Sequence, residues 1–356
     1  MGETKPTRVS HNSETDVMWL SEPVLADVLS VRTVVRDGWY NMPTDLAWWK
    51  GYYWLSYRRG TGHSCVRGNS AVVLLCSNDL RRWNRAHIFE PPESIVDGRG
   101  IAAGHFTQTD DTLYLFCPVQ WPGESGVPSR IFMYWTSNGL DWSAPQVLCL
   151  DNDYPYTWRV RSHDDRFYAA ICYLEDDEGP FDLIVSDDAV HWTRHAQIAA
   201  ANPNHFTEES DLHWRPDGEL WCVVRSHGPA LMYWSEPPYT TWEGGVNLGG
   251  RCDAPVICAS GKRVYLAGRV AAPGNPHGTA GVYQLTRGRA DLILSMPAGG
   301  DSAYPGLISL EPGRMAMSFY SDVAYWSGLV KPRHFEAYQR KRSECDIYLA
   351  EFALGV

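Results

Sequence analysis

The sequence contains no run of 18 or more apolar residues, which excludes an ordinary membrane-spanning helix. Its nine cysteines include no Cys-x-x-Cys pair, which argues against a zinc knuckle or a redox motif. Basic residues are in deficit, because 31 Lys and Arg stand against 42 Asp and Glu, a formal net charge of −11. That balance disfavours binding to nucleic acid or to an anionic membrane. No helical periodicity is evident either, which favours an all-β fold.

The first 16 residues are polar and lack the apolar segment of a signal peptide. We therefore expect a cytoplasmic protein, or a secreted or periplasmic one if a leader has been removed beforehand. The odd number of cysteines and their apolar settings predict reduced thiols that act as small hydrophobic side chains. The sequence does not indicate an oligomeric state.

The chain is rich in aromatic residues, with 16 Trp and 19 Tyr, as suits strands. Four segments repeat one pattern, in which an apolar run is followed by Ser, an acidic or Asn residue, a short turn and Trp. They are SNDLRRW at 77–83, SNGLDW at 137–142, SDDAVHW at 186–192 and SEPPYTTW at 235–242. Their starts lie about 50 to 60 residues apart, which is typical of β-propeller blades.

Tight turns upstream of these segments predict hairpins, for example Lys50-Gly51 and Pro216-Asp217-Gly218. Two further units, from Asp253 to Leu294 and around Tyr304 to Tyr320, lack the Ser-to-Trp pattern but have strand composition. We therefore predict one domain over residues 1–356, a six-bladed β-propeller. A strand at about 345–352 should pair with one at about 28–35 and close the ring.

In a propeller the innermost strands line the central channel, and loops at one end hold the site. We expect these strands near Asp45, Ile101, Trp158, Ser210, Ala254 and Pro305. Polar side chains recur at their beginnings, among them Asp45, His105, Arg159 and Glu209. The predicted site therefore lies where the inner strands start.

Two stretches resemble sialidases. The repeated turn is similar to the sialidase Asp-box, with variable spacing and few of the usual Gly and Thr residues. The stretch from Glu209 to Arg225 resembles the blade that carries a catalytic Glu and a carboxylate-binding Arg, and the stretch 301–307 resembles the one with the tyrosine nucleophile, here Tyr304. Sialidases are tyrosine-nucleophile glycosidases. The resemblance implies Tyr304 as nucleophile, Glu209 as its base and Arg225 as an anion ligand.

Other sialidase positions differ. The Arg-Ile-Pro motif is replaced by Tyr40-Asn41-Met42-Pro43, which removes one substrate-binding Arg. After the next strand the chain reads Arg58-Arg59-Gly60-Thr61-Gly62-His63, so that His63 stands nearest the acid and Arg58 is a candidate ligand. Arg269 is the nearest candidate for the third Arg. The chain therefore resembles the broad sialidase-like group of propellers more than true sialidases.

Three functions remain open. The first is a sialidase-like exo-glycosidase acting on an anionic glycan or glycoside, with His63 or Asp45 as the acid. The second is a polysaccharide or uronate lyase in which His63 and Tyr304 exchange protons beside Arg225 or Arg159. The third is a noncatalytic glycan-binding propeller.

A five-bladed propeller is an alternative fold, because Ser210-Asp211-Leu212 also resembles part of the five-bladed glycosidases that use three carboxylates. The catalytic carboxylates would then be Asp45, one from the third blade, and Glu209. Trp158 and His105 are further candidates for contacts with a carbohydrate substrate. No spacing of histidines or cysteines suggests a metal, and we expect no cofactor.

Overall fold

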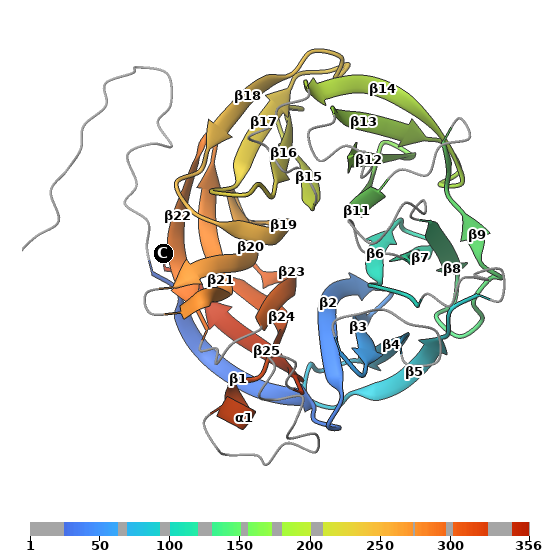
Figure 1. Ribbon diagram of the computed structural model, residues 1–356, viewed down its shortest axis with the longest axis vertical. Helices are drawn as coiled ribbons and strands as arrows, with labels where there is room; N and C mark the ends of the chain where they lie inside the picture. Colours follow the sequence, from blue (N-terminus) through green and yellow to red (C-terminus); the bar gives the residue numbers. More distant parts are fainter. Residues whose placement is uncertain are drawn as a thin grey trace, which may run out of the picture.

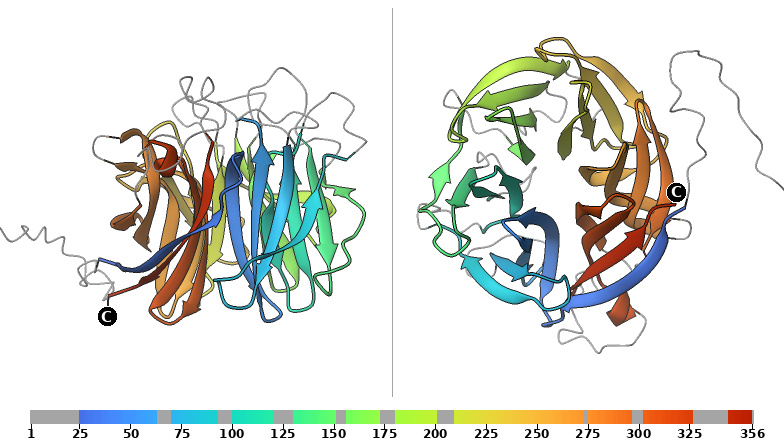
Figure 2. Two further views of the ribbon diagram at one scale, coloured as in Figure 1. Left: turned by 90° about the horizontal axis from the view of Figure 1, so that it is seen from below. Right: turned by 180° about the vertical axis from the view of Figure 1, so that it is seen from behind.

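A computed structural model describes residues 25–62, 70–92, 100–119, 130–150, 156–172, 180–200, 209–272, 275–296, 302–326 and 344–355. The described strands form six sheets around a central axis, a six-bladed β-propeller (Figure 1). The view from behind shows the same ring of blades, and the other view shows that ring from its side (Figure 2). The predicted all-β, six-bladed fold is confirmed. The five-bladed alternative is wrong, because the described strands form six separate sheets.

In the first five blades the four main strands run outward from the axis in chain order, and in the sixth the earliest described strand lies outermost. The first blade contains β2 (Tyr40–Trp49), β3 (Tyr52–Gly60), β4 (Ser70–Ser77) and β5 (Asn84–Phe89). The second contains β6 (His105–Gln108), β7 (Leu113–Pro118), β8 (Ile131–Thr136) and β9 (Gln146–Val147). The third contains β11 (Tyr156–His163), β12 (Arg166–Cys172), β13 (Phe181–Ser186) and β14 (His191–Ala199), with β10 (Cys149–Leu150) parallel to β14.

The fourth blade contains β15 (Ser210–Trp214), β16 (Leu220–Val224), β17 (Leu231–Ser235) and β18 (Glu243–Asn247). The fifth contains β19 (Cys252–Ser260), β20 (Arg263–Ala272), β21 (Asn275–Thr286) and β22 (Arg289–Ser295). The sixth contains β23 (Ser302–Glu311), β24 (Arg314–Ser321), β25 (Asp346–Ala353) and β1 (Asp27–Val35), with the short helix α1 (Val323–Trp326) after β24.

The sixth blade is built from both ends of the described chain. β1 pairs antiparallel with β25, with Asp27 beside Ala353 and Arg32 beside Leu349. Arg32 forms an ion pair with Glu351 at 2.6 Å across the two strands. This pairing closes the ring.

The Ser-to-Trp turns are held by side-chain acceptors. Asp79 Oδ1 accepts hydrogen bonds from the backbone of Arg81 and Arg82, and Asp188 Oδ1 accepts two in the same way. One residue of each turn has positive φ, and the four are Leu80, Gly139, Ala189 and Tyr239. The second turn begins at Thr136, one residue earlier than the sequence pattern suggested, because Thr136 Oγ1 accepts from Asn138 and Gly139.

The inner strands contact one another around the axis in the order β2, β6, β11, β15, β19, β23 and back to β2. Four of these described strands have an irregularity near the start, around residues 42–43, 158–159, 254–255 and 304–305. Three of these positions read X-Pro, and the third blade has Trp158-Arg159 instead. A β-bulge re-aims side chains, and these four positions lie at equivalent places near the starts of their strands.

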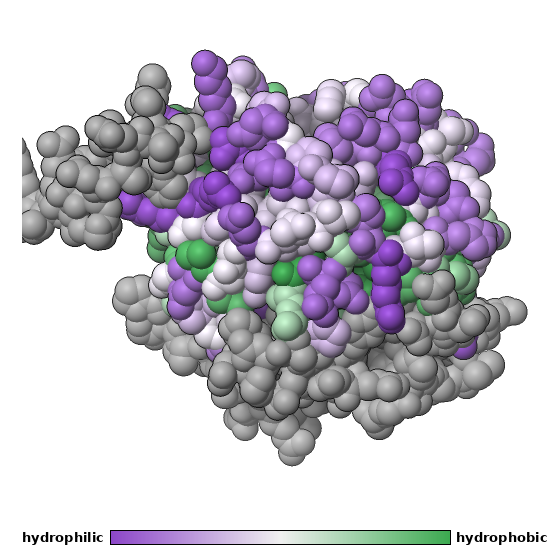
Figure 3. Space-filling model, turned by 90° about the horizontal axis from the view of Figure 1, so that it is seen from above, coloured by the Kyte–Doolittle hydropathy of each residue, from purple (hydrophilic) through white to green (hydrophobic). Residues whose placement is uncertain are grey.

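Apolar side chains fill the space between blades, for example Trp54, Leu115 and Phe132 between the first and second. The flank drawn in Figure 3 is mainly polar, with smaller apolar areas among the polar side chains. Among the described residues, no helix has the length and apolar character needed to cross a bilayer.

Candidate active site

Tyr304, Glu209 and Arg225 meet where the inner strands of the fourth and sixth blades begin. Arg225 Nη1 lies 3.0 Å from Glu209 Oε1 and donates a hydrogen bond of 3.1 Å to the Tyr304 hydroxyl. One guanidinium nitrogen therefore contacts both the predicted base and the predicted nucleophile. Glu209 is 0% exposed and Tyr304 is 4% exposed, so the contact is shielded from bulk water.

Local structure explains how Glu209 and Arg225 come together. They flank the β15–β16 hairpin, in which Ser210 pairs with Val224, and the backbone N–H of Arg225 donates to the carbonyl of Glu209 at 2.8 Å. The second carboxylate oxygen of Glu209 accepts a hydrogen bond of 2.6 Å from the backbone of Ala254 on β19. The carboxylate is therefore fixed from two neighbouring blades.

Asp253 forms ion pairs with three arginines of this region. Its carboxylate lies 3.6 Å from Arg225 Nε and 3.7 Å from Arg269 Nη1, and it accepts two hydrogen bonds of 2.8 and 2.9 Å from Arg251 Nε. Arg269 also lies over the Tyr304 ring, with its guanidinium carbon 4.6 Å from the centroid. Among the described residues, three guanidinium groups thus face two carboxylates, which leaves one net positive charge.

The Tyr304 phenol is held in its neutral form. Burial raises its pKa well above 10, and the nearby Glu209 carboxylate raises it further, while Arg225 and Arg269 act in the opposite direction. The backbone is also in an uncommon conformation, with φ of 42° at Tyr304 and 96° at Ala303. Strained backbone at a buried titratable residue is a feature of functional sites.

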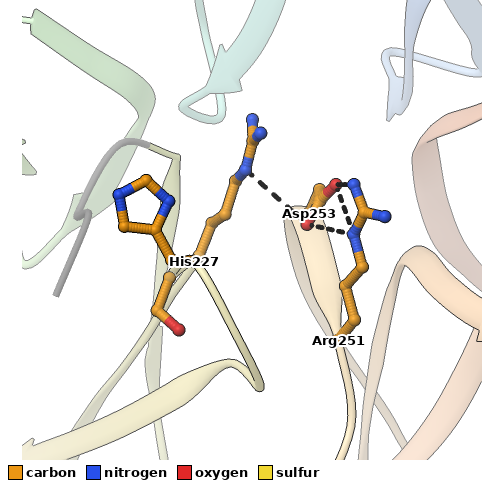
Figure 4. A pocket seen from close by; sticks show the side chains of 5 residues that line it. His227, Arg251 and Asp253 are labelled. Atoms are coloured by element: carbon orange, nitrogen blue, oxygen red, sulfur yellow. Dashed lines mark hydrogen bonds and ion pairs between the residues drawn. The ribbon is translucent and has the colours of Figure 1, made fainter. Parts of the chain in front are cut away.

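A pocket of about 230 Å³ adjoins this cluster and is lined by Arg225, Ser226, His227, Arg251 and Asp253. Ser226 and His227 come from the loop between β16 and β17, and Arg251 immediately precedes β19. Figure 4 shows His227 on one side of the pocket and the Arg251–Asp253 pair on the other. Arg225 and Asp253 belong to both the pocket and the Tyr304 cluster, so a ligand in the pocket would lie beside the predicted nucleophile.

A second network lies in the channel region and contains Asp45 and Arg159. Arg159 Nη1 contacts Asp45 Oδ1 at 2.8 Å, and both side chains are buried. Burial would raise the pKa of Asp45, but Arg159 and His105 outweigh it and hold that pKa below its usual value. Arg159 also donates to the carbonyls of Pro255 and Pro305 at 3.2 and 2.9 Å. Asp45 and Arg159 are therefore bound to each other and to other blades.

The remaining candidates are distributed between these networks and the blade interior. The His105 ring packs at a tilt against Trp158, with ring centroids 4.3 Å apart and an interplanar angle of 57°, and burial together with Arg159 lowers the pKa of His105 to about 4. Trp158 also contacts the Tyr304 ring edge-on, at 5.5 Å. Arg58 is fully buried and donates to the carbonyls of Met42 and Gly62 within its own blade. His63 lies outside the described residues.

The sequence did not single out Arg251, Ser226 or His227 as ligands. Arg251 stands three residues before Ala254, near which the sequence predicts an inner strand, so that position was the available signal. In the described part of the chain, no group of three or more His, Cys, Asp or Glu side chains is placed to hold a metal ion.

The sequence matches a family model described as "Glycosyl hydrolases family 32 N-terminal domain" over residues 34–214, just over half of the chain. The chain belongs to this family. The matched part of the family 32 domain includes Asp45 and Glu209 and ends before Arg225, Asp253 and Tyr304. No curated protein matches the sequence.

Solved structures similar to this family 32 chain share its fold at low identity. A Dyadobacter fermentans protein of unknown function is 16% identical, with a TM-score of 0.74 over 93% of this chain and 99% of the other. The Ruminococcus gnavus intramolecular trans-sialidase, in complex with oseltamivir carboxylate, is 11% identical, with a TM-score of 0.56 over 79% and 90%. A Bombyx mori GH32 β-fructofuranosidase mutant, in complex with sucrose, is 16% identical, with a TM-score of 0.52 over 83% and 70%. The fold is thus of the glycosidase type found in sialidases and family 32 enzymes.

Proposed function

We propose that the protein is a sialidase-like exo-glycosidase in which Tyr304 is the nucleophile and Glu209 its base. The observation that carries this proposal is the contact of one Arg225 nitrogen with both the Tyr304 hydroxyl and the Glu209 carboxylate. A nucleophile and a base that both contact one guanidinium group in a buried site fit covalent catalysis.

The chemistry requires both residues. A phenol whose pKa lies well above 10 is a poor nucleophile near neutral pH, so its proton must be removed during attack. In the proposed first step the Tyr304 oxygen bonds to the anomeric carbon and its proton passes to Glu209, while the predicted acid His63 gives a proton to the leaving-group oxygen as the glycosidic bond breaks. Water then attacks the tyrosyl glycoside and gives a proton to His63, and Glu209 returns its proton to the departing phenol oxygen.

The arginines support an anionic substrate. Arg225 and Arg251 line the pocket, and Arg269 lies over the Tyr304 ring. An anionic group in the pocket would draw Arg225 away from Glu209 and leave that carboxylate free to accept a proton. The pocket is smaller than the roughly 300–1,000 Å³ typical of drug-sized ligands, which favours one terminal sugar unit and therefore exo action.

A mechanism with three carboxylates is less well supported. It would need Asp45 to act on substrate, but Asp45 is neutralised by Arg159 and accepts a hydrogen bond from Phe106 at 2.8 Å. The described start of the third blade supplies Arg159 where that mechanism would use a carboxylate. We therefore assign Asp45 a structural part, and His63 remains the predicted acid.

The test is a panel of fluorogenic neutral and anionic glycosides, with sucrose included, assayed with wild type, Tyr304→Phe and Glu209→Gln. We expect release from an anionic glycoside and a loss of at least about 10²-fold in each variant, since removal of a general base typically costs 10²–10⁴-fold. The matched control is Tyr348→Phe, whose hydroxyl contacts Asp346 away from the pocket. Full activity of Tyr304→Phe would refute the proposal, and a product that absorbs in the ultraviolet would indicate the lyase instead.

A further inference from the structure

Three side chains hold the main chain on both sides of the Tyr304–Pro305 peptide. Thr44 Oγ1 donates to the Tyr304 carbonyl at 3.1 Å, and Arg159 Nη2 donates to the Pro305 carbonyl at 2.9 Å. The Gly306 N–H donates to Ser318 Oγ at 3.2 Å, and Ser318 Oγ lies 3.0 Å from Thr44 Oγ1. Three consecutive residues are therefore each fixed by a side chain.

The main chain needs such support because its conformation is unfavourable. Both Ala303 and Tyr304 have positive φ, which non-glycine residues seldom adopt without tertiary contacts. Gly306 packs directly on β2, where a Cβ atom would lie 2.2 Å from the Leu46 backbone nitrogen. The segment is thus pressed against the first blade and cannot shift in that direction.

Arg159 is suited to its position by its geometry. It occupies the place in β11 where β2, β19 and β23 carry proline, and its guanidinium reaches Asp45, Pro255 and Pro305. These acceptors lie on the first, fifth and sixth blades, so one side chain joins them to the third. Arg159 reaches its three acceptors from three separate nitrogens, whereas the three N–H donors of a lysine radiate from one nitrogen and do not span acceptors spread around a guanidinium group.

We propose that Arg159 and Thr44 are positioning residues that fix the Tyr304 backbone and thereby aim its hydroxyl at the substrate. This inference rests on the proposed role of Tyr304 as nucleophile. Neither residue touches the reacting atoms in the proposed mechanism; both act through the peptide that carries Tyr304. A misplacement of about 1 Å in such a group can cost on the order of 10²-fold in rate.

The experiment compares Arg159→Met, Arg159→Lys and Thr44→Val with Arg161→Met. Arg161 is the matched control, because it lies on the same strand and forms a comparable inter-blade pair, with Asp211, without contacting the Tyr304 segment. We expect kcat to fall at least tenfold in both Arg159 variants and several-fold in Thr44→Val, with KM changed less than threefold. Arg161→Met should keep kcat within about twofold.

A second readout does not depend on turnover. Incorporation of 3-fluorotyrosine gives one ¹⁹F signal per tyrosine, and the loss of a signal in Tyr304→Phe assigns Tyr304. We expect this signal to shift or broaden in the Arg159 and Thr44 variants and to keep its position in Arg161→Met. If the Arg159 variants fail to fold, Thr44→Val decides, because it removes one hydroxyl and leaves the Arg159–Asp45 pair in place.

The outcomes separate this inference from the proposed function. An unshifted Tyr304 signal with normal kcat in the folded variants would overturn the positioning role even if Tyr304→Phe is inactive. Full activity of Tyr304→Phe would overturn the proposed nucleophile, and the proposed effect on catalysis would fall with it. A shifted signal in Arg161→Met as well would show general loosening of the channel and would also overturn the inference.

Discussion

The buried Asp45–Arg159 pair should show strong coupling in a double-mutant cycle of stability. The charges are 2.8 Å apart, and Coulomb's law at an effective dielectric constant of about 20 gives roughly 6 kcal/mol of attraction. Much of this offsets the cost of removing both ions from water, but loss of one partner leaves the other charge buried alone. Such a loss typically costs about 3–5 kcal/mol.

We therefore expect Arg159→Met and Asp45→Asn each to lower the free energy of unfolding by a few kcal/mol, with Arg159→Met lowering it more because three acceptors lose a donor. The double variant should be less destabilised than the sum of the two, by at least about 1 kcal/mol. Urea unfolding followed by fluorescence measures all four proteins. Additive effects would show that the two charges do not stabilise each other and would refute this account.

Three other predictions follow from described contacts. Burial lowers the pKa of His105 to about 4, against an unfolded value near 6.5. The unfolded state therefore binds a proton first as pH falls below 6.5, and about 3 kcal/mol of stability is lost as pH falls towards 4. The free energy of unfolding, measured across this pH range, should depend less on pH in His105→Phe than in wild type. Gly306→Ala should destabilise the protein by several kcal/mol, because the added Cβ would overlap the β2 backbone. Gly313→Ala has open space around it and should cost only the strain of its positive φ. Urea midpoints compare the two variants, and equal losses of stability would contradict the packing argument. Asp188→Ala should cost about 1–2 kcal/mol through the loss of two backbone hydrogen bonds in its turn, and an unchanged midpoint would show that the turn does not need its acceptor.

Local patterns in the sequence were sufficient to predict the blades. The Ser-to-Trp turns depend on contacts between residues two or three apart, and the hairpin at Lys50-Gly51 depends on positive φ at both positions, 47° and 83°. The second turn was placed one residue late because Thr136 takes the position that Ser has elsewhere, and threonine offers the same hydroxyl acceptor. The proximity of Glu209 and Arg225 also followed from a local feature, the hairpin between them.

The channel network could not be predicted in the same way. Arg159 contacts residues 96 to 146 positions away, and those contacts exist only when the ring is closed and the inner strands are in register. An arginine at the start of a strand looks the same in sequence whether it faces a ligand, solvent or a buried carboxylate. Arg251 could not be predicted as a pocket residue for the same reason, because the pocket forms only where Arg251 lies beside the loop with Ser226 and His227.

The shared sixth blade has a consequence for the order in which the protein matures during synthesis. β1, the earliest of the described strands to emerge from the ribosome, must wait for β25 before it pairs with its neighbour. Blades one to five can form by local pairing while the sixth is incomplete, since their strands follow each other in the chain. Tyr304 belongs to the late blade, whereas Glu209 and Arg225 belong to the fourth, so the site is assembled by the final closure of the ring. A nascent chain that lacks β25 would thus carry the base without a correctly held nucleophile.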